Sequence, residues 1–167
     1  MKKILCCFFI SLSVHSFAQS DATFREYNKT FTTYPFSNPN PVPDPASLFY
    51  PYFRYDGFTD HSIQKEWKVV ELENDFIKLI ILPQVGGKIW TAIDKKNGKP
   101  FIYDNDAIKF RDIAMRGPWA SGGLEANFGI IGHTPGVATP VNYLTRKNAD
   151  GSVSCIISLL DLLTQTR

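Results

Sequence analysis

The chain has 167 residues and carries 18 lysines and arginines against 16 aspartates and glutamates. Residues 1–18 have the pattern of a cleaved leader, which contains Lys2 and Lys3 and no acidic residue. Its removal would leave 16 basic and 16 acidic residues. Such a balance, without a basic stripe or a basic amphipathic helix, argues against a nucleic-acid or anionic-membrane surface. Of the three cysteines only Cys155 lies outside the leader, which excludes an internal disulfide and a cysteine metal site in the processed chain.

Residues 1–18 have the pattern of a secretory signal peptide. Lys2 and Lys3 precede an apolar run from Ile4 to Val14, and Ser16 and Ala18 are the small residues expected before cleavage. The run is too short to cross a bilayer. The pattern predicts a signal helix cut after Ala18 and a periplasmic or extracellular protein, with a buried N-terminal helix as the alternative. Cys6 and Cys7 lie at the start of the apolar run, whereas a lipoprotein cysteine would follow it.

Residues 19–60 are polar, aromatic and, from Pro35 onward, rich in proline. Prolines at alternate positions exclude a helix or an interior strand and favour an extended path. We therefore expect an arm rather than a domain. Its many aromatic residues favour contact between the arm and the following domain. The alternative is that the arm is a proline-rich ligand for another protein.

Residues 61–167 have the alternation and turns of β structure. The expected strands are Lys65–Leu72, Phe76–Leu82, Lys88–Ile93 with Pro100–Tyr103 across Asn97-Gly98, and Val141–Arg146 with Ser152–Leu160 around Asp150-Gly151. Together they predict an all-β, antiparallel sandwich. The last apolar strand runs to Arg167 without a turn or polar tail, so we expect an incomplete domain, with a complete small sandwich as the alternative.

The stretch from Lys109 to Pro135 mixes charged, amide, aromatic and imidazole side chains with five glycines, without helical or strand periodicity. Glycines allow close approach to a ligand, while the other side chains supply a flat apolar face and directed hydrogen bonds. A sugar needs this combination, because its C–H faces lie on aromatic rings and its hydroxyls bind carboxylate, amide and guanidinium groups.

The chain resembles the DUF5107 family. The resemblance lies in FIKLIILPQVGGKIW, DKKNGKPFIYDN, KFRDIAMRGPW, SGGLEANFGIIGHTP and DGSVSC, and it extends from about Tyr50 to Arg167. It implies the N-terminal part of a supersandwich similar to galactose mutarotases and glycoside hydrolases. It also implies an exported bacterial protein of the kind common in Bacteroidetes, with a carbohydrate-related role and tetratricopeptide repeats after the domain.

Glu125 and His133 are the candidate catalytic residues. Glu125 and Asn127 would share one face of an extended segment, and Glu125 could act as acid, base or sugar ligand. The alternative is an internal ion pair of Glu125 with Arg111 or Arg116. His133 could shuttle a proton or donate a hydrogen bond, or it could be a structural histidine.

The candidate substrate-binding residues are Arg111, Arg116, Trp119 and Asn127. Trp119 lies in the glycine-rich loop and could stack on a sugar ring, whereas Trp67 and Trp90 alternate within strands and are predicted to be core. Gly86-Gly87-Lys88 lacks phosphate-loop spacing and is predicted to be a turn between strands.

No metal or cofactor is predicted. His61 and His133 lack the spacing of zinc ligands, and Asp104, Asp106 and Asp112 lack the regular spacing of a calcium loop.

Two classes of function remain. One is an exported enzyme acting on glycosides or sugar anomers, whose second acid would be Asp112 or a residue beyond Arg167. The other is a non-catalytic carbohydrate-binding or interaction module. A perturbed carboxylate in a cleft would favour the enzyme, and an exposed aromatic platform would favour the module.

Overall fold

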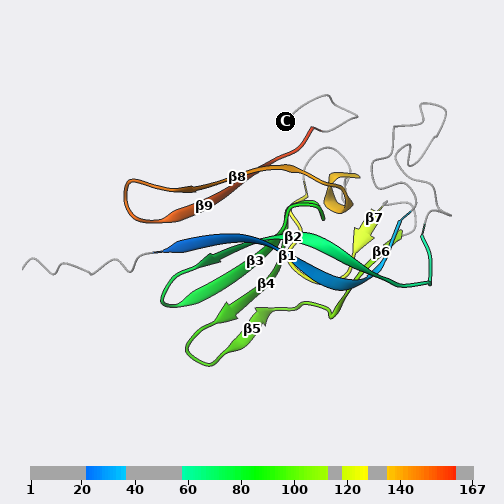
Figure 1. Cartoon of the computed structure of the whole chain (residues 1–167), viewed down its shortest axis with the longest axis horizontal. Coiled ribbons are helices and arrows are strands. Elements are labelled where there is room, and N and C mark those ends of the chain that lie inside the picture. Colours follow the sequence, from blue (N-terminus) through cyan, green and yellow to red (C-terminus); the bar gives the residue numbers. More distant parts are fainter. Residues whose placement is uncertain (1–21, 37–57, 113–117, 128–134, 161–167) are drawn as a thin grey trace, which may run out of the picture.

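Figure 1 shows a computed structural model of the chain, which describes residues 22–36, 58–112, 118–127 and 135–160. In these described residues nine strands make up two sheets, with one short 3-10 helix, η2, at Pro135–Ala138. The strands are β1 (Thr23–Tyr34), β2 (Ile63–Glu73), β3 (Ile77–Leu82), β4 (Lys88–Asp94), β5 (Lys99–Ile102), β6 (Ala107–Asp112), β7 (Pro118–Ala120), β8 (Asn142–Lys147) and β9 (Val153–Ser158). The all-β sandwich class expected from the sequence is therefore confirmed.

The larger sheet has seven strands in the order β5-β4-β3-β2-β1-β6-β7. Its pairs are antiparallel except for β1 and β6, which run parallel over Thr32–Tyr34 and Ala107–Lys109. A purely antiparallel sheet was expected, and the difference has a topological cause. After β5 the chain crosses from one edge of the sheet to β1 instead of making another hairpin, and it arrives in the same direction as β1.

The sheet is curled, and the segment after β7 returns to β4. Ile89 and Leu124 form a bridge of two backbone hydrogen bonds, with N···O distances of 3.2 and 2.8 Å. Residues 35 positions apart in the sequence are thereby held side by side. This closure brings the β5–β6 connection close to β7.

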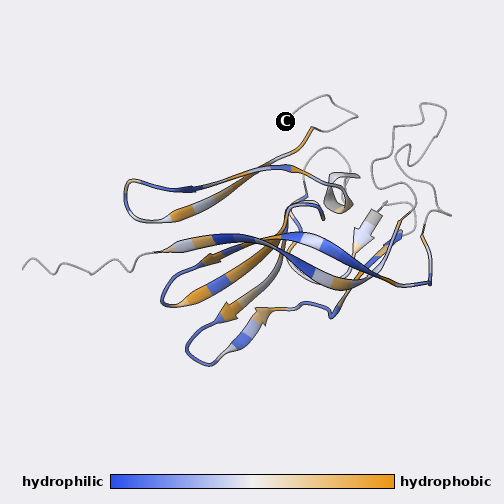
Figure 2. Ribbon diagram, in the orientation of Figure 1, coloured by the Kyte–Doolittle hydropathy of each residue, from blue (hydrophilic) through white to orange (hydrophobic). Residues whose placement is uncertain are grey.

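The two hairpins predicted from turn dipeptides, β4–β5 and β8–β9, are present. Gly98 and Gly151 have φ of +69° and +84°, the left-handed conformation that these tight turns require. Figure 2 shows hydrophilic residues at the turn between β4 and β5. Gly86-Gly87 forms the turn between β3 and β4, as predicted. The sequence thus located both hairpins and this turn.

The prediction that residues 19–60 form an extended arm is wrong for residues 23–34. Thr23–Tyr34 forms β1, which lies inside the sheet between β2 and β6. The prolines that argued against an interior strand begin only at Pro35, and residues 23–34 contain none. The proline-rich stretch at 37–57 lies outside the described residues.

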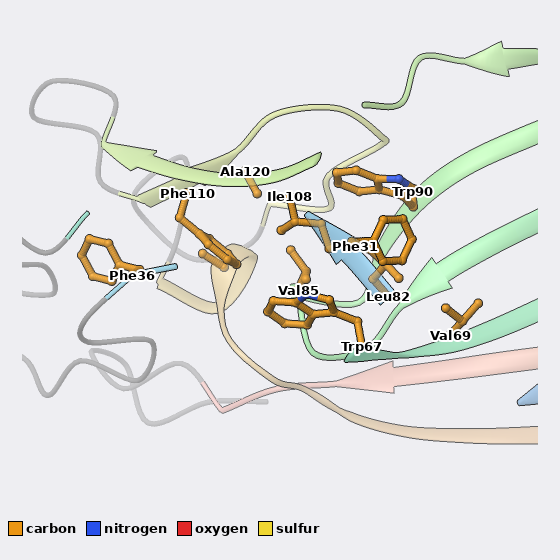
Figure 3. Packing of buried hydrophobic residues seen from close by; sticks show 11 residues of the cluster. Phe31, Phe36, Trp67, Val69, Leu82, Val85, Trp90, Ile108, Phe110 and Ala120 are labelled. Atoms are coloured by element: carbon orange, nitrogen blue, oxygen red, sulfur yellow. The ribbon is translucent and has the colours of Figure 1, made fainter. Parts of the chain in front are cut away.

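The core lies inside the curl (Figure 3). The rings of Phe31 and Trp90 meet edge to face, with centroids 6.2 Å apart and planes at 73°. The indole N–H of Trp67 donates to Thr33 Oγ1 at 2.8 Å, so this buried polar group is satisfied. The prediction that Trp67 and Trp90 are core residues is confirmed, and each such burial contributes about 1.5–3 kcal/mol.

The second sheet, β8–β9, lies against the larger one. Tyr143 Oη and Thr145 Oγ1 donate to the two carboxylate oxygens of Glu26 on β1, at 2.9 and 2.7 Å. A side chain at Gly87 would collide with Ile157 at 2.8 Å, so the turn before β4 packs closely on β9. Cys155 lies in β9 with a free thiol and is only partly buried. Burial raises the pKa of this thiol.

Candidate functional site

The structure describes the side chains of four predicted site residues: Arg111, Trp119, Glu125 and Asn127. Arg116 and His133 lie outside the described residues, as does the side chain of Asp112. Arg111 and Trp119 are cross-strand partners on β6 and β7, whereas Glu125 and the exposed Asn127 follow Leu124. The glycine-rich stretch therefore divides into separate environments.

Glu125 forms an ion pair, but with a residue that the sequence did not indicate. Its Oε2 lies 3.8 Å from Nζ of Lys88, and the side chains of Glu125 and Lys88 are 13% and 3% exposed. The same Nζ donates to the backbone carbonyl of Ala120. Burial lowers the pKa of Lys88, and the charge of Glu125 opposes that shift. Glu125 is thus in an internal ion pair, as the alternative prediction held, but its cation is Lys88 and not Arg111 or Arg116.

Arg111 is held by residues 58–59 and by β1. Its Nη1 donates to the carbonyls of Thr59 and Phe110, at 3.1 and 2.7 Å. Its guanidinium lies 5.0 Å from the ring centroid of Phe58 and 5.9 Å from that of Tyr34. These contacts hold the guanidinium of Arg111 against residues 58–59 and β1, and its part in ligand binding stays a prediction.

A cavity opens where β1 and β6 diverge. Only Thr32–Tyr34 pair with β6, so in the described structure residues 29–31 have no strand partner on that side. Residues 104–106 of the β5–β6 connection face this gap. The cavity has a volume of about 300 Å³. It is lined by Lys29, Thr30, Phe31, Thr32, Gln64, Ile80, Trp90, Thr91, Asp104, Asn105 and Asp106.

Several polar side chains of the cavity are held in place by the protein. Gln64 Nε2 donates to Thr32 Oγ1 at 3.0 Å. Asn105 Nδ2 donates to Ser121 Oγ and its Oδ1 accepts from Tyr103 Oη, both at 2.6 Å. Fixed donors and acceptors lose little freedom when a ligand binds, which favours affinity.

The apolar part of the cavity comes from the core. Trp90, which is 2% exposed, lines it together with Phe31 and Ile80. Outside the cavity, Phe101 and Tyr103 are 59% and 73% exposed near the edge of the sheet. Alternate residues of an extended segment share a face, so we expect these two rings on one side of the segment, where the hydroxyl of Tyr103 donates to Asn105 Oδ1.

This cavity was not expected from the sequence. Asp104 and Asp106 were considered only as weak calcium ligands, and Trp90 was predicted to be core, without a ligand role. The available signal was the polar run Asp104-Asn105-Asp106 directly after an aromatic strand. Within the described residues, no group of three or more histidine, cysteine, aspartate or glutamate side chains is arranged to hold a metal ion.

The chain matches a known protein family and is similar to a solved structure. Residues 43–167 match the family model "Domain of unknown function (DUF5107)". The chain is also similar to the crystal structure of a TPR-domain containing protein from Parabacteroides distasonis ATCC 8503, with 28% identity and a TM-score of 0.66. The match covers 79% of this chain and 23% of that chain, so this chain spans about a quarter of the other's length. No helix in the described part is long and apolar enough to span a membrane.

Proposed function

The chain belongs to the DUF5107 family, and we propose that it is an exported carbohydrate-binding domain within a larger protein. The observation that carries this proposal is the cavity between β1 and residues 104–106. Its volume of about 300 Å³ is at the lower end of the ~300–1,000 Å³ typical of small-molecule sites. This volume suits one or two sugar rings.

The chemistry of the lining supports a sugar rather than a wholly apolar or strongly charged ligand. Carboxylates at Asp104 and Asp106 accept hydrogen bonds from hydroxyls, and the amide of Asn105 and the ammonium of Lys29 donate them. Trp90 provides the apolar contact for sugar C–H groups. Lys29 partly offsets the two acids, so a neutral ligand is favoured.

The exposed rings of Phe101 and Tyr103 favour the binding module over the enzyme. Glu125 is engaged by Lys88, and His133, the other proposed catalytic residue, lies outside the described residues. Processing of glycosides by this chain remains the second candidate. It is favoured by one observation, the partly buried carboxylate of Glu125 beside a lysine of lowered pKa.

Export and membership of a larger protein complete the proposal. Export is supported by the signal-peptide pattern of residues 1–18, and N-terminal sequencing of the secreted protein would test cleavage after Ala18. The larger protein, with tetratricopeptide repeats, is supported by the similar structure, whose name states that it contains such a domain.

A glycan screen on the full chain tests the function, with binding measured by calorimetry and by tryptophan fluorescence. We expect Asp104→Ala to weaken binding by about tenfold to a hundredfold, since a charge-assisted hydrogen bond contributes about 1.5–3 kcal/mol. Asp60→Ala is the matched control, because Asp60 is an exposed acid that does not line the cavity. Equal losses in both variants, or no glycan bound by the wild type, would contradict the proposal. Product release from a bound glycoside would favour the enzyme.

A further inference from the structure

We infer that the buried Lys88–Glu125 pair is a positioning device that fixes one wall of the cavity, residues 104–106. The expectation that this pair affects ligand affinity rests on the proposed function. The device includes the segment 121–125, here called the clasp segment, which lies between the pair and the wall. Neither Lys88 nor Glu125 lines the cavity, so both would act through other residues.

The first step is the attachment of the clasp segment to β4. Leu124 exchanges two backbone hydrogen bonds with Ile89. On either side of this bridge, Lys88 Nζ reaches the carbonyl of Ala120 and the carboxylate of Glu125. One buried ammonium group therefore contacts the residue just before the segment, Ala120, and the last residue of the segment, Glu125. Because this ammonium group is buried, little water competes for these contacts.

The second step is the contact between the clasp segment and the wall. Gly123 N donates to the carbonyl of Tyr103 at 2.6 Å, and Ser121 Oγ accepts from Asn105 Nδ2 at 2.6 Å. A Cβ at Gly122 would lie 3.2 Å from the backbone nitrogen of Asn105 and 3.4 Å from Cα of Asp104. The segment thus lies close to the backbone of the wall and is hydrogen-bonded to it.

The third step follows from the strand that carries Lys88. Trp90, the apolar floor of the cavity, lies two residues further along β4. The pair therefore joins the clasp segment, and through it the wall, to the strand that bears the floor. The separation of wall and floor sets the width of the cavity. Loosening the pair should loosen the wall while the rest of the sheet stays intact.

Hydrogen exchange measured on the full chain tests the inference in two variants. Glu125→Gln keeps the shape of the side chain and removes its charge. We expect amide exchange at least about tenfold faster at 103–106 and 121–125, with little change in β2 and β3. Glu71→Gln is the matched control, since Glu71 is also buried and bonded to Arg25 and Tyr27. It should not affect residues 103–106 selectively.

Ser121→Ala provides a second test if Glu125→Gln fails to fold. It removes the bond from Asn105 without disturbing a buried charge, and it should also speed exchange at 103–106. Where the wild type binds a glycan, both variants should weaken binding by about fivefold or more, and Glu71→Gln should not.

The two proposals can fail separately. If no glycan binds to the wild type, the proposed function fails, while selective exchange at 103–106 would still support the positioning device. If exchange in Glu125→Gln rises evenly over the sheet, or only as much as in Glu71→Gln, the positioning device is refuted. Unchanged glycan affinity in both Glu125→Gln and Ser121→Ala would also refute its role in binding.

Discussion

Replacing Gly123 by alanine should destabilise the protein more than the same change at Gly98. Both glycines have left-handed backbones, with φ of +72° and +69°. A Cβ at Gly98 would meet nothing within 4 Å, whereas at Gly123 it would lie 2.5 Å from the carbonyl oxygen of Ile89. The pair of variants therefore separates the cost of the backbone conformation from the cost of close contact.

The left-handed conformation costs a non-glycine residue about 1–2 kcal/mol, and this cost is common to both variants. At Gly123 the clash must also move the clasp segment away from β4, because backbone atoms cannot turn aside as a flexible side chain can. That movement would break the two hydrogen bonds between Leu124 and Ile89, each with a net value of about 0.5–1.5 kcal/mol. We expect Gly123→Ala to cost about 1–3 kcal/mol more than Gly98→Ala.

Urea denaturation followed by circular dichroism measures both free energies of unfolding, and equal slopes would show that the unfolded states are comparable. Equal losses in the two variants would refute the reasoning. They would mean that residue 123 does not approach β4 closely, and the closure of the sheet by the clasp segment would be wrong.

Two further predictions concern buried and charged groups. Thr33→Val should lower the free energy of unfolding, measured by urea denaturation, by about 1–3 kcal/mol, because the indole N–H of Trp67 loses its buried acceptor. The control is Thr30→Val, at an exposed residue, which should change the free energy of unfolding by less than about 0.5 kcal/mol. Hydrogen bonding by Lys95 lowers the pKa of Glu73 from its usual value of 4.5. Ionised Glu73 therefore stabilises the folded protein at pH values above 4.5, and this stabilisation is lost as the pH falls through the lowered pKa. Thermal unfolding of Glu73→Gln should accordingly depend less on pH in this acidic range, and curves of equal slope for the two proteins would contradict the assignment.

Local patterns were enough to predict much of the fold. Alternation located β2, turn dipeptides located the β4–β5 and β8–β9 hairpins, and the apolar run located β3. These features depend on neighbours in the sequence, where period and turn chemistry act directly. β1 was missed because the prolines that follow Tyr34 were taken to describe the whole stretch 19–60.

The candidate site could be predicted only in part. Glu125 was predicted to be catalytic, with an ion pair to Arg111 or Arg116 as the alternative; the structure pairs it instead with Lys88, which lies 37 positions earlier and reaches it through the curl of the sheet. Arg111 looked like a ligand residue from its glycine-rich surroundings, yet Phe58, Thr59 and Tyr34 hold it. A charged residue in a loop says little about which group it will meet.

The sequence by itself determined the all-β class, the hairpin turns, the core tryptophans and the membership of the DUF5107 family. Only the tertiary structure decided that β1 and β6 pair in parallel over just three residues, with the cavity beside Asp104 and Asp106 where the preceding residues of β1 do not pair with β6. Hairpins and strands follow from contacts between near neighbours. A gap between two strands depends instead on where distant segments meet, and packing of the whole curled sheet sets that meeting point.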